Sequence, residues 1–336
     1  MLNTAQRRAL LKAAREGDLE RLASEATGAV SLPVPLRREM LHEAAAHGHL
    51  SVVQYCAGGG RRSTAVRFDT DLDLDCRDEH LRTPLYLAAA AGHMLVCSWL
   101  LEHGSRVDAR KRGDWTSLMI AACHGHVQVV RLLLDHKPQG ANIHLVNREG
   151  SNAVALAARE GQVGALDALF YGLSVASRAE LVNAPSNQGK TALGRAAFCG
   201  RDEVVKQLFV ACGEGELLDI MVRDKGGNTV LIDAIAGGHP NTARSLLELC
   251  ASKHQRLSLL QGVDDAGQSL LHHAVITGPL ELVQSVLDLL REYDDADFVL
   301  MWMLNVRDCL GRTPRDMAEQ RRARHLAEAL SAIVAQ

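Results

Sequence analysis

A pattern that recurs every 33 to 44 residues constrains the fold of this chain more than any other feature. In its clearest copy, a Thr-Pro-Leu triplet begins at Thr83, an Ala-Ala pair follows at Ala88 and a Gly-His pair at Gly92. The same order returns from Thr116. Later copies open at Asn152, Thr191, Thr229, Ser269 and Thr313. A period of this length is typical of solenoids, in which each unit packs only against its neighbours.

Each recurring residue type has a physical role in a helix pair. Thr83 is placed to cap a helix with its hydroxyl, and Pro84 suits the first helical position because it has no N–H to leave unpaired. The Ala88-Ala89 pair lets neighbouring helices approach closely, and the glycines at positions such as Gly92 suit a left-handed helix end. Turns with Asp and Gly, such as Asp224 with Gly227, follow the second helices. The sequence therefore predicts an all-α solenoid of about nine helix-turn-helix units with finger-like β-turns between repeats.

The pattern also divides the chain. We expect one domain over 1–336, with an N-terminal capping unit at 1–36, seven internal repeats at 37–306 and a C-terminal capping unit at 307–336. An insertion at 58–76 opens with three glycines and predicts a flexible excursion. Surplus residues at 171–185, 211–220 and 251–261 predict elongated helices or loops, and 288–306 predicts an amphipathic or partly buried segment, although the sequence does not fix the structure of these insertions.

The repeated triplet and its period resemble the ankyrin-repeat family, whose motif is T-P-L-H-x-A at a period near 33, over essentially the whole chain. The resemblance implies a concave surface, made of the finger turns and the outward side of each first helix, that binds other proteins. It also implies which positions contact a partner, and these are Arg82, Arg112, Trp115, His124, Arg148, Arg159, Lys190 and Phe198.

Two aromatic residues, Trp115 and Phe198, are the expected anchors of this surface, because Trp and Arg are enriched at interface hot spots. Packing of Trp115 against the neighbouring finger is the alternative. The middle of the surface is basic, which predicts a partner with an acidic surface. Its cations are Arg110, Lys111, Arg112, Arg148, Arg159 and Lys190.

Composition limits the classes of ligand and the cellular compartments that are expected for this chain. The chain has 37 Lys+Arg against 40 Asp+Glu, so bulk nucleic-acid binding is not favoured. Its eight cysteines include no C-x-x-C pair, and its start has no apolar signal segment, which predicts reduced thiols inside a cell. We expect a monomer that is located in the cytoplasm, or in both the cytoplasm and the nucleus. No run of 18 apolar residues exists, which predicts that the protein has no membrane span.

One segment imitates a nucleotide site. Residues 184–191 fit a permissive phosphate-loop pattern: Ala or Gly, four residues, then Gly-Lys-Thr. A true phosphate loop needs a buried strand before it and a helix N-terminus aimed at the phosphate. Here Gly189 and Thr191 are already explained by the repeat, so a nucleoside triphosphatase is disfavoured and Lys190 is expected at a fingertip.

Metal and catalytic patterns are equally weak. His42 and His47 are five residues apart, not the four that a zinc-binding helix requires. The acidic run from Asp69 to Asp75 lacks the glycine and the terminal glutamate of a calcium loop. The basic run 321–324 is read as a solvated face of the capping helix. We therefore expect no enzyme, no cofactor and no metal.

Three functions remain open on sequence grounds. The first is a non-catalytic scaffold or adaptor for protein–protein interaction. The second follows from segments at 113–122, 228–250 and 269–278, which resemble repeats of an ankyrin-repeat auxiliary factor of alanyl-tRNA synthetase and would imply a role in its quality control. The third is a nuclear or nucleic-acid-associated regulatory factor that uses the basic fingers.

Overall fold

A computed structural model describes residues 4–26, 32–58, 72–291 and 296–334 of this protein. Over these residues it contains twenty-one α-helices and no strand, apart from one isolated bridge between Val263 and Ser269. The expected all-α repeat solenoid is confirmed. Most of the insertion at 58–76, from 59 to 71, lies outside the described residues. None of the described helices combines the length and apolar character needed to span a bilayer.

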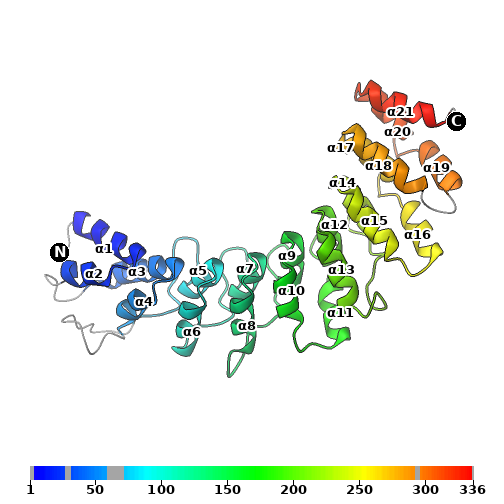
Figure 1. Ribbon diagram of the computed structural model, residues 1–336. Coiled ribbons are helices and arrows are strands. Elements are labelled where there is room, and N and C mark those ends of the chain that lie inside the picture. The colour runs from blue at the N-terminus through cyan, green and yellow to red at the C-terminus, as the bar shows by residue number, and fades with distance from the viewer. Residues whose placement is uncertain (1–3, 27–31, 59–71, 292–295, 335–336) are drawn as a thin grey trace. The chain divides into compact units, whose positions relative to one another are not determined.

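The chain forms two compact units, one of residues 1–148 with 167–169 and the other of 149–166 with 170–336. In the first unit, helices come in pairs, and the first or inner helices α1, α3, α5 and α7 lie side by side, as do the outer helices α4, α6 and α8 (Figure 1). The pairs are α1 (Thr4–Glu16) with α2 (Leu19–Ala26), α3 (Val34–His47) with α4 (Leu50–Ala57), α5 (Pro84–Ala91) with α6 (Met94–Glu102), and α7 (Ser117–Cys123) with α8 (Val127–Asp135).

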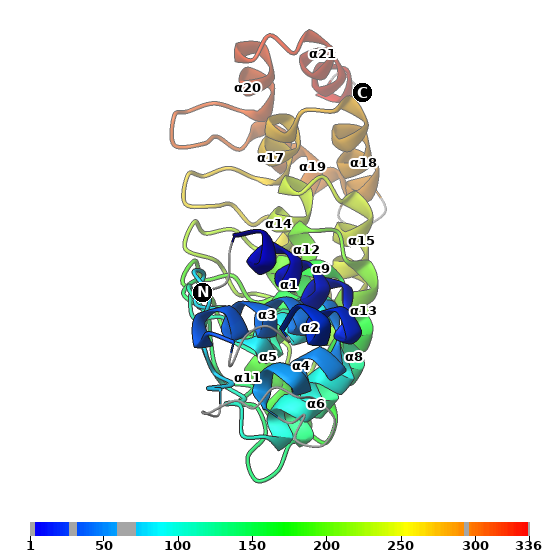
Figure 2. The same cartoon turned by 90° about the vertical axis from the view of Figure 1, so that its left-hand side faces the viewer.

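The second unit repeats this arrangement. It begins with α9 (Ala153–Glu160), and α10 (Val163–Phe170) has residues in both units. Its pairs are α12 (Ala192–Phe198) with α13 (Asp202–Ala211), α14 (Val230–Ala236) with α15 (Pro240–Glu248), α17 (Leu270–Thr277) with α18 (Leu280–Arg291), and α20 (Pro314–Gln320) with α21 (Arg324–Val334). Figure 2 shows its finger turns projecting on the side of the inner helices α14, α17 and α20.

The surplus residues are more structured than expected. Separate helices, α11 (Val175–Asn183), α16 (Lys253–Leu260) and α19 (Ala296–Asn305), follow outer helices instead of extending them. Ser174 and Ser252 start two of them, because each hydroxyl accepts a hydrogen bond from the backbone N–H three residues later. Only 211–220 remains a run of turns. In α19, Val299 and Met303 are buried while Phe298 is exposed, as an amphipathic segment predicts.

Capping and close packing hold the pairs together. The Thr83 hydroxyl accepts a hydrogen bond from Tyr86 N at 3.2 Å, and Thr116 caps α7 in the same way. The Ala88 and Ala89 side chains are fully buried, which lets adjacent inner helices approach closely. All eight cysteines are free thiols, and burial raises the pKa of Cys56 to about 12.

Candidate binding surface

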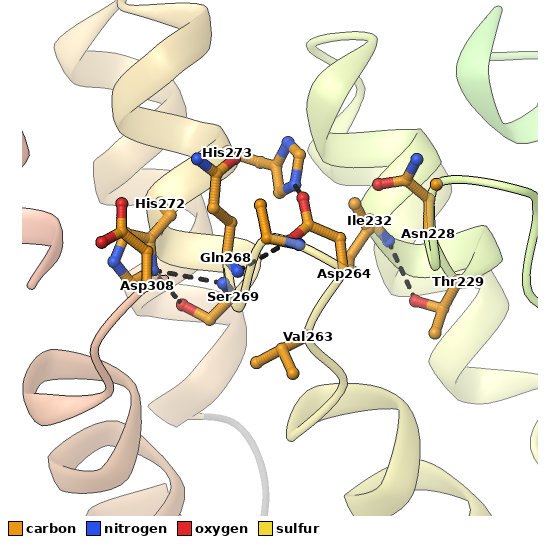
Figure 3. Close-up of polar contacts among 12 residues, drawn as sticks. Asn228, Thr229, Ile232, Val263, Asp264, Gln268, Ser269, His272, His273 and Asp308 are labelled. Carbon is orange, nitrogen blue, oxygen red and sulfur yellow. Dashed lines mark hydrogen bonds and ion pairs between the residues drawn. The ribbon is translucent and has the colours of Figure 1, made fainter. Parts of the chain in front are cut away.

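Several fingers are organised by an aspartate that accepts hydrogen bonds from the backbone of its own finger. In the finger at 264–268, Asp264 Oδ1 accepts hydrogen bonds from Ala266 N at 2.9 Å and Gln268 N at 2.7 Å, and its second oxygen lies 3.0 Å from His273 Nε2 (Figure 3). Asp224 and Asp308 accept equivalent bonds in their fingers. The sequence signal, an Asp three residues before a Gly, therefore produces a tight and internally bonded turn.

Neighbouring fingers are also joined to each other by main-chain hydrogen bonds. In the second unit, Lys225 N donates to Gln188 O at 2.9 Å, and Asp265 N donates to Gly226 O at 3.0 Å. Asn187 and Cys309 extend this chain of bonds in the two directions. These links use main-chain atoms, so they do not depend on which side chains the fingertips carry.

The buried His272 ties an inner helix to the following finger. Its Nδ1 accepts a hydrogen bond from Ser269 N at 3.2 Å (Figure 3), and its Nε2 donates to Arg312 O at 3.0 Å. This pairing assigns the proton of the neutral ring to Nε2. Burial holds the pKa of His272 below its ordinary value.

A groove in the first unit, open to solvent, has a volume of about 660 Å³. The inner helix α3 contributes Arg38 and Glu43, α1 contributes Leu11 on one side, and the finger around Arg77 closes the other side. We refer to this hollow as the α3 groove. Its walls are fixed, because His42 Nε2 lies 3.1 Å from both Cys76 O and Arg82 O across the base of the finger.

Internal ion pairs occupy most carboxylates of the α3 groove. Arg15 Nε pairs with Glu43 Oε2 at 2.9 Å, and Arg7 pairs with Glu39. Arg82 Nε pairs with Asp78 Oδ2 at 2.7 Å, and hydrogen bonds from the backbone and side chain of Arg82 help hold the pKa of that carboxyl below its usual value, although burial opposes this shift. Further groove residues that form no ion pair within the described part of the chain are the exposed arginines Arg38 and Arg77.

The structure places the predicted contact residues of the first unit in different settings. Arg82 lines the α3 groove, and Arg112 is exposed at a finger. Trp115 is half-buried, with Lys111 Nζ 5.4 Å from its ring centroid and 5.1 Å from that of Tyr86. His124 is exposed, and its Nδ1 donates to Ala90 O at 2.7 Å.

The last predicted residue of this unit, Arg148, is exposed, and its backbone N–H donates to Gly113 O at 2.8 Å. The sequence allowed Trp115 to be either an exposed anchor or packed against the neighbouring finger. In the structure it is half-buried, with a lysine of its own finger beside its ring. The finger residues Arg110 and Arg112 are exposed cations, so basic charge is present on this part of the first unit.

In the second unit the predicted cations are paired. Arg159 Nε lies 2.8 Å from Glu160 Oε1. Lys190 Nζ forms an ion pair with Asp233 and lies 3.3 Å from Asp224 Oδ2. Phe198 is 46% exposed, with Lys190 Nζ 5.2 Å from its ring centroid. The exposed aromatic that the sequence predicted is present, but the lysine beside it is occupied by carboxylates.

These contacts also bear on the nucleotide-like segment at 184–191. Thr191 caps the short helix α12 by accepting a hydrogen bond from Gly194 N, and Lys190 points to aspartates, not to an open phosphate cradle. Isolated bridging aside, no strand occurs in the residues described, so no buried strand precedes the segment. Among those same residues, no cluster of three or more His, Cys, Asp or Glu could hold a metal ion.

Sequence reasoning missed most of the α3 groove. Arg38 and Arg77 lie before the first Thr-Pro-Leu triplet, where the repeat pattern is least regular, and the motif therefore gave them no contact position. A usable signal was present in the charge distribution. Residues 1–148 carry 19 Lys+Arg against 16 Asp+Glu, whereas 149–336 carry 18 against 24, so the unpaired basic charge is expected in the first part of the chain.

Comparison with protein families agrees with this architecture. A family model described as ankyrin repeats, in three copies, matches residues 41–144. The matched stretch covers α3 to α8 apart from the first turns of α3, and it contains the finger side of the α3 groove as well as Trp115.

Proposed function

We propose, from the premise that this chain is an ankyrin-repeat protein, that it is a non-catalytic scaffold or adaptor that holds a partner protein on its fingers and inner helices. Ankyrin repeats are protein–protein interaction modules, which supports the general part of the proposal. The narrower part concerns which surface is used and how.

The observation that carries the proposal is the main-chain bonding of the fingers. Because Asp265 N, Lys225 N and Arg148 N donate to the preceding finger, the turns are fixed before any partner arrives. A fixed surface loses little conformational entropy on binding, so more of the contact energy appears as affinity. Exposed side chains such as Arg112 and Phe198 lie on these fingers and on the inner helices.

The non-catalytic part rests on the family and on the most enzyme-like residue of the chain. Lys190 would be the phosphate-binding lysine of a nucleotide site, yet its ammonium group is paired with Asp224 and Asp233. A lysine in that setting supports a structural role in the finger.

Site-directed photo-crosslinking tests the proposal. A photoreactive amino acid replaces Arg112 or Phe198 on the proposed surface, and Lys206, exposed on the outer helix α13, serves as the control position. We expect a discrete protein adduct in cell extract from the first two positions and none from the third. Equal adducts from all three positions would contradict the proposal.

Mass spectrometry of the adduct separates the narrower alternatives. Recovery of alanyl-tRNA synthetase would identify the chain as an auxiliary of that enzyme. Adducts that disappear on nuclease treatment would indicate a nucleic-acid-associated role instead.

A further inference from the structure

We infer that the α3 groove is the docking site for an acidic segment of a partner protein, one in which apolar side chains lie among the carboxylates. This inference rests on the proposed function and names the class of partner. It is carried by the combination of unpaired cations and half-exposed apolar residues in one preformed hollow of about 660 Å³.

The charge that the α3 groove presents to a partner depends on which of its side chains are already neutralised. Glu39, Glu43 and Asp78 each pair with an arginine, so these three carboxylates and their partners add no net charge to the groove. Arg38 and Arg77 are exposed, line the same groove and form no ion pair with a described residue. Glu79 is the one other lining carboxylate, and it has no arginine partner among the residues that the structure describes. Arg38 and Arg77 therefore leave the groove with a small positive excess, which attracts carboxylates of a partner.

Apolar surface lies between these charges. Leu11 on α1 and Leu87 on α5 are half-exposed, and Pro35 at the start of α3 is exposed. Burial of such side chains under a partner is favourable because it removes apolar area from water. A purely acidic segment would leave this surface wet, so apolar residues are expected in the same segment.

The remaining carboxylates favour a protein over a nucleic acid. Glu79 is strongly exposed at the finger, and Glu39, Glu43 and Asp78 stay at the groove walls even though they are paired. A phosphate backbone carries negative charge at every nucleotide and gains affinity in proportion to the number of cations that it contacts. A peptide can instead place its carboxylates against Arg38 and Arg77 and its neutral residues beside the glutamates.

The groove is also preformed. The Arg15–Glu43 pair joins α1 to α3, and His42 joins α3 to the finger through Cys76 O and Arg82 O. The two sides of the groove are therefore fixed relative to its floor, so docking does not require a folding step.

The test uses the full chain and a fluorescein-labelled peptide of alternating Asp and Leu residues, with fluorescence anisotropy as the readout. The Arg38→Glu/Arg77→Glu variant should bind this peptide at least tenfold more weakly. The matched control is Lys137→Glu, which reverses an exposed cation outside the α3 groove, and it should bind as the wild type does. Replacing the Leu residues of the peptide with Ser should also weaken binding.

Three results would overturn the inference. They are unchanged binding in the double variant, an equal loss in Lys137→Glu, or tighter binding of a single-stranded RNA of the same charge. Circular dichroism melts check that the variants are folded, and Arg38→Ala/Arg77→Ala replaces the double variant if charge reversal unfolds it. Crosslinks from Arg112 and Phe198 test the proposed function at positions outside the groove. Failure of the groove inference can therefore be told apart from failure of the proposed scaffold function.

Discussion

Lys190, at the end of one finger, forms an ion pair with Asp233 on the inner helix α14, 43 residues further along the chain. The Asp233 side chain is almost fully buried, and this burial raises its pKa to about 6 even though Lys190 and a hydrogen bond from it act in the opposite direction. The aspartate therefore carries its charge at neutral pH at a cost in stability.

Asp233→Asn should reveal this cost in the pH dependence of unfolding. Between about pH 4 and pH 6 the folded protein binds a proton at Asp233 that the unfolded chain does not, so acidification stabilises the wild type through this group. Relative to the variant, the wild type should gain up to about 3 kcal/mol in unfolding free energy as the pH falls from 7 to 4. Urea denaturation of both proteins across this range measures the difference, and parallel pH profiles would contradict it.

His272 should affect the pH dependence of unfolding in the opposite direction to Asp233, so that acidification destabilises the protein through this group. Its Nδ1 accepts a hydrogen bond from Ser269 N, so protonation would set two donors against each other, and burial already lowers its pKa. Stability from the neutral ring is present above the ordinary value of 6.5, and it is lost as the pH falls through that value because the unfolded chain takes up the proton first.

His272→Gln is expected to remove that acid-sensitive contribution and to cost about 1 kcal/mol at pH 8 through weakened hydrogen bonds. Urea titrations at pH 8 and pH 6 should show the two proteins converging in stability at the lower pH. Stability profiles of the two proteins that stay parallel between pH 8 and pH 6 would contradict this role of the neutral ring.

Trp115→Ala separates the binding role of this residue from its packing. The contact with Lys111 should make the substitution cost about 1 kcal/mol in stability, whereas a hot-spot role should lower partner capture at least tenfold. Thermal melts and the crosslinking yield at Arg112 measure the two effects. Trp99→Ala, on the outer helix α6, should leave the yield unchanged, and a stability loss of several kcal/mol at Trp115 would show that it serves mainly as packing.

Gly227→Ala should destabilise the protein more than Gly311→Ala, although both glycines have a φ of 76°. The left-handed backbone costs alanine about 1 kcal/mol at each position. At Gly227 the added carbon would also lie 2.6 Å from Asp265 N of the next finger, whereas nothing described lies within 4 Å at Gly311. Chemical denaturation should show a difference of at least about 1 kcal/mol, because a backbone atom must move in one case only. Equal losses would mean that the fingers are not closely joined.

The helix pairs could be predicted from sequence because their signals are local. The Thr83 and Thr116 caps act within one helical turn, and the Ala-Ala pairs recur with the motif. The helices that begin after Ser174 and Ser252 carried the same local signal, a serine before a helical run, but the repeat pattern led us to expect extensions of the outer helices or loops there.

The binding surface was less predictable because its charge balance depends on distant pairs. The motif correctly placed Lys190 next to a capped helix, but its partner Asp233 comes from the next repeat. Similarly, Arg15 pairs with Glu43 whereas Arg38 forms no ion pair with a described residue, and this difference depends on how α1 packs against α3. The distribution of Lys and Arg between the two parts of the chain indicated the region but not the residues.

The main-chain links between fingers have a consequence for how such a protein can diversify. Asp265 N and Lys225 N bond to carbonyl oxygens that every residue type supplies, so new side chains at tip positions other than the closely packed glycines leave these links intact. Specificity for a different partner can thus be acquired by exchanging a few tip residues, while the architecture beneath them needs no redesign.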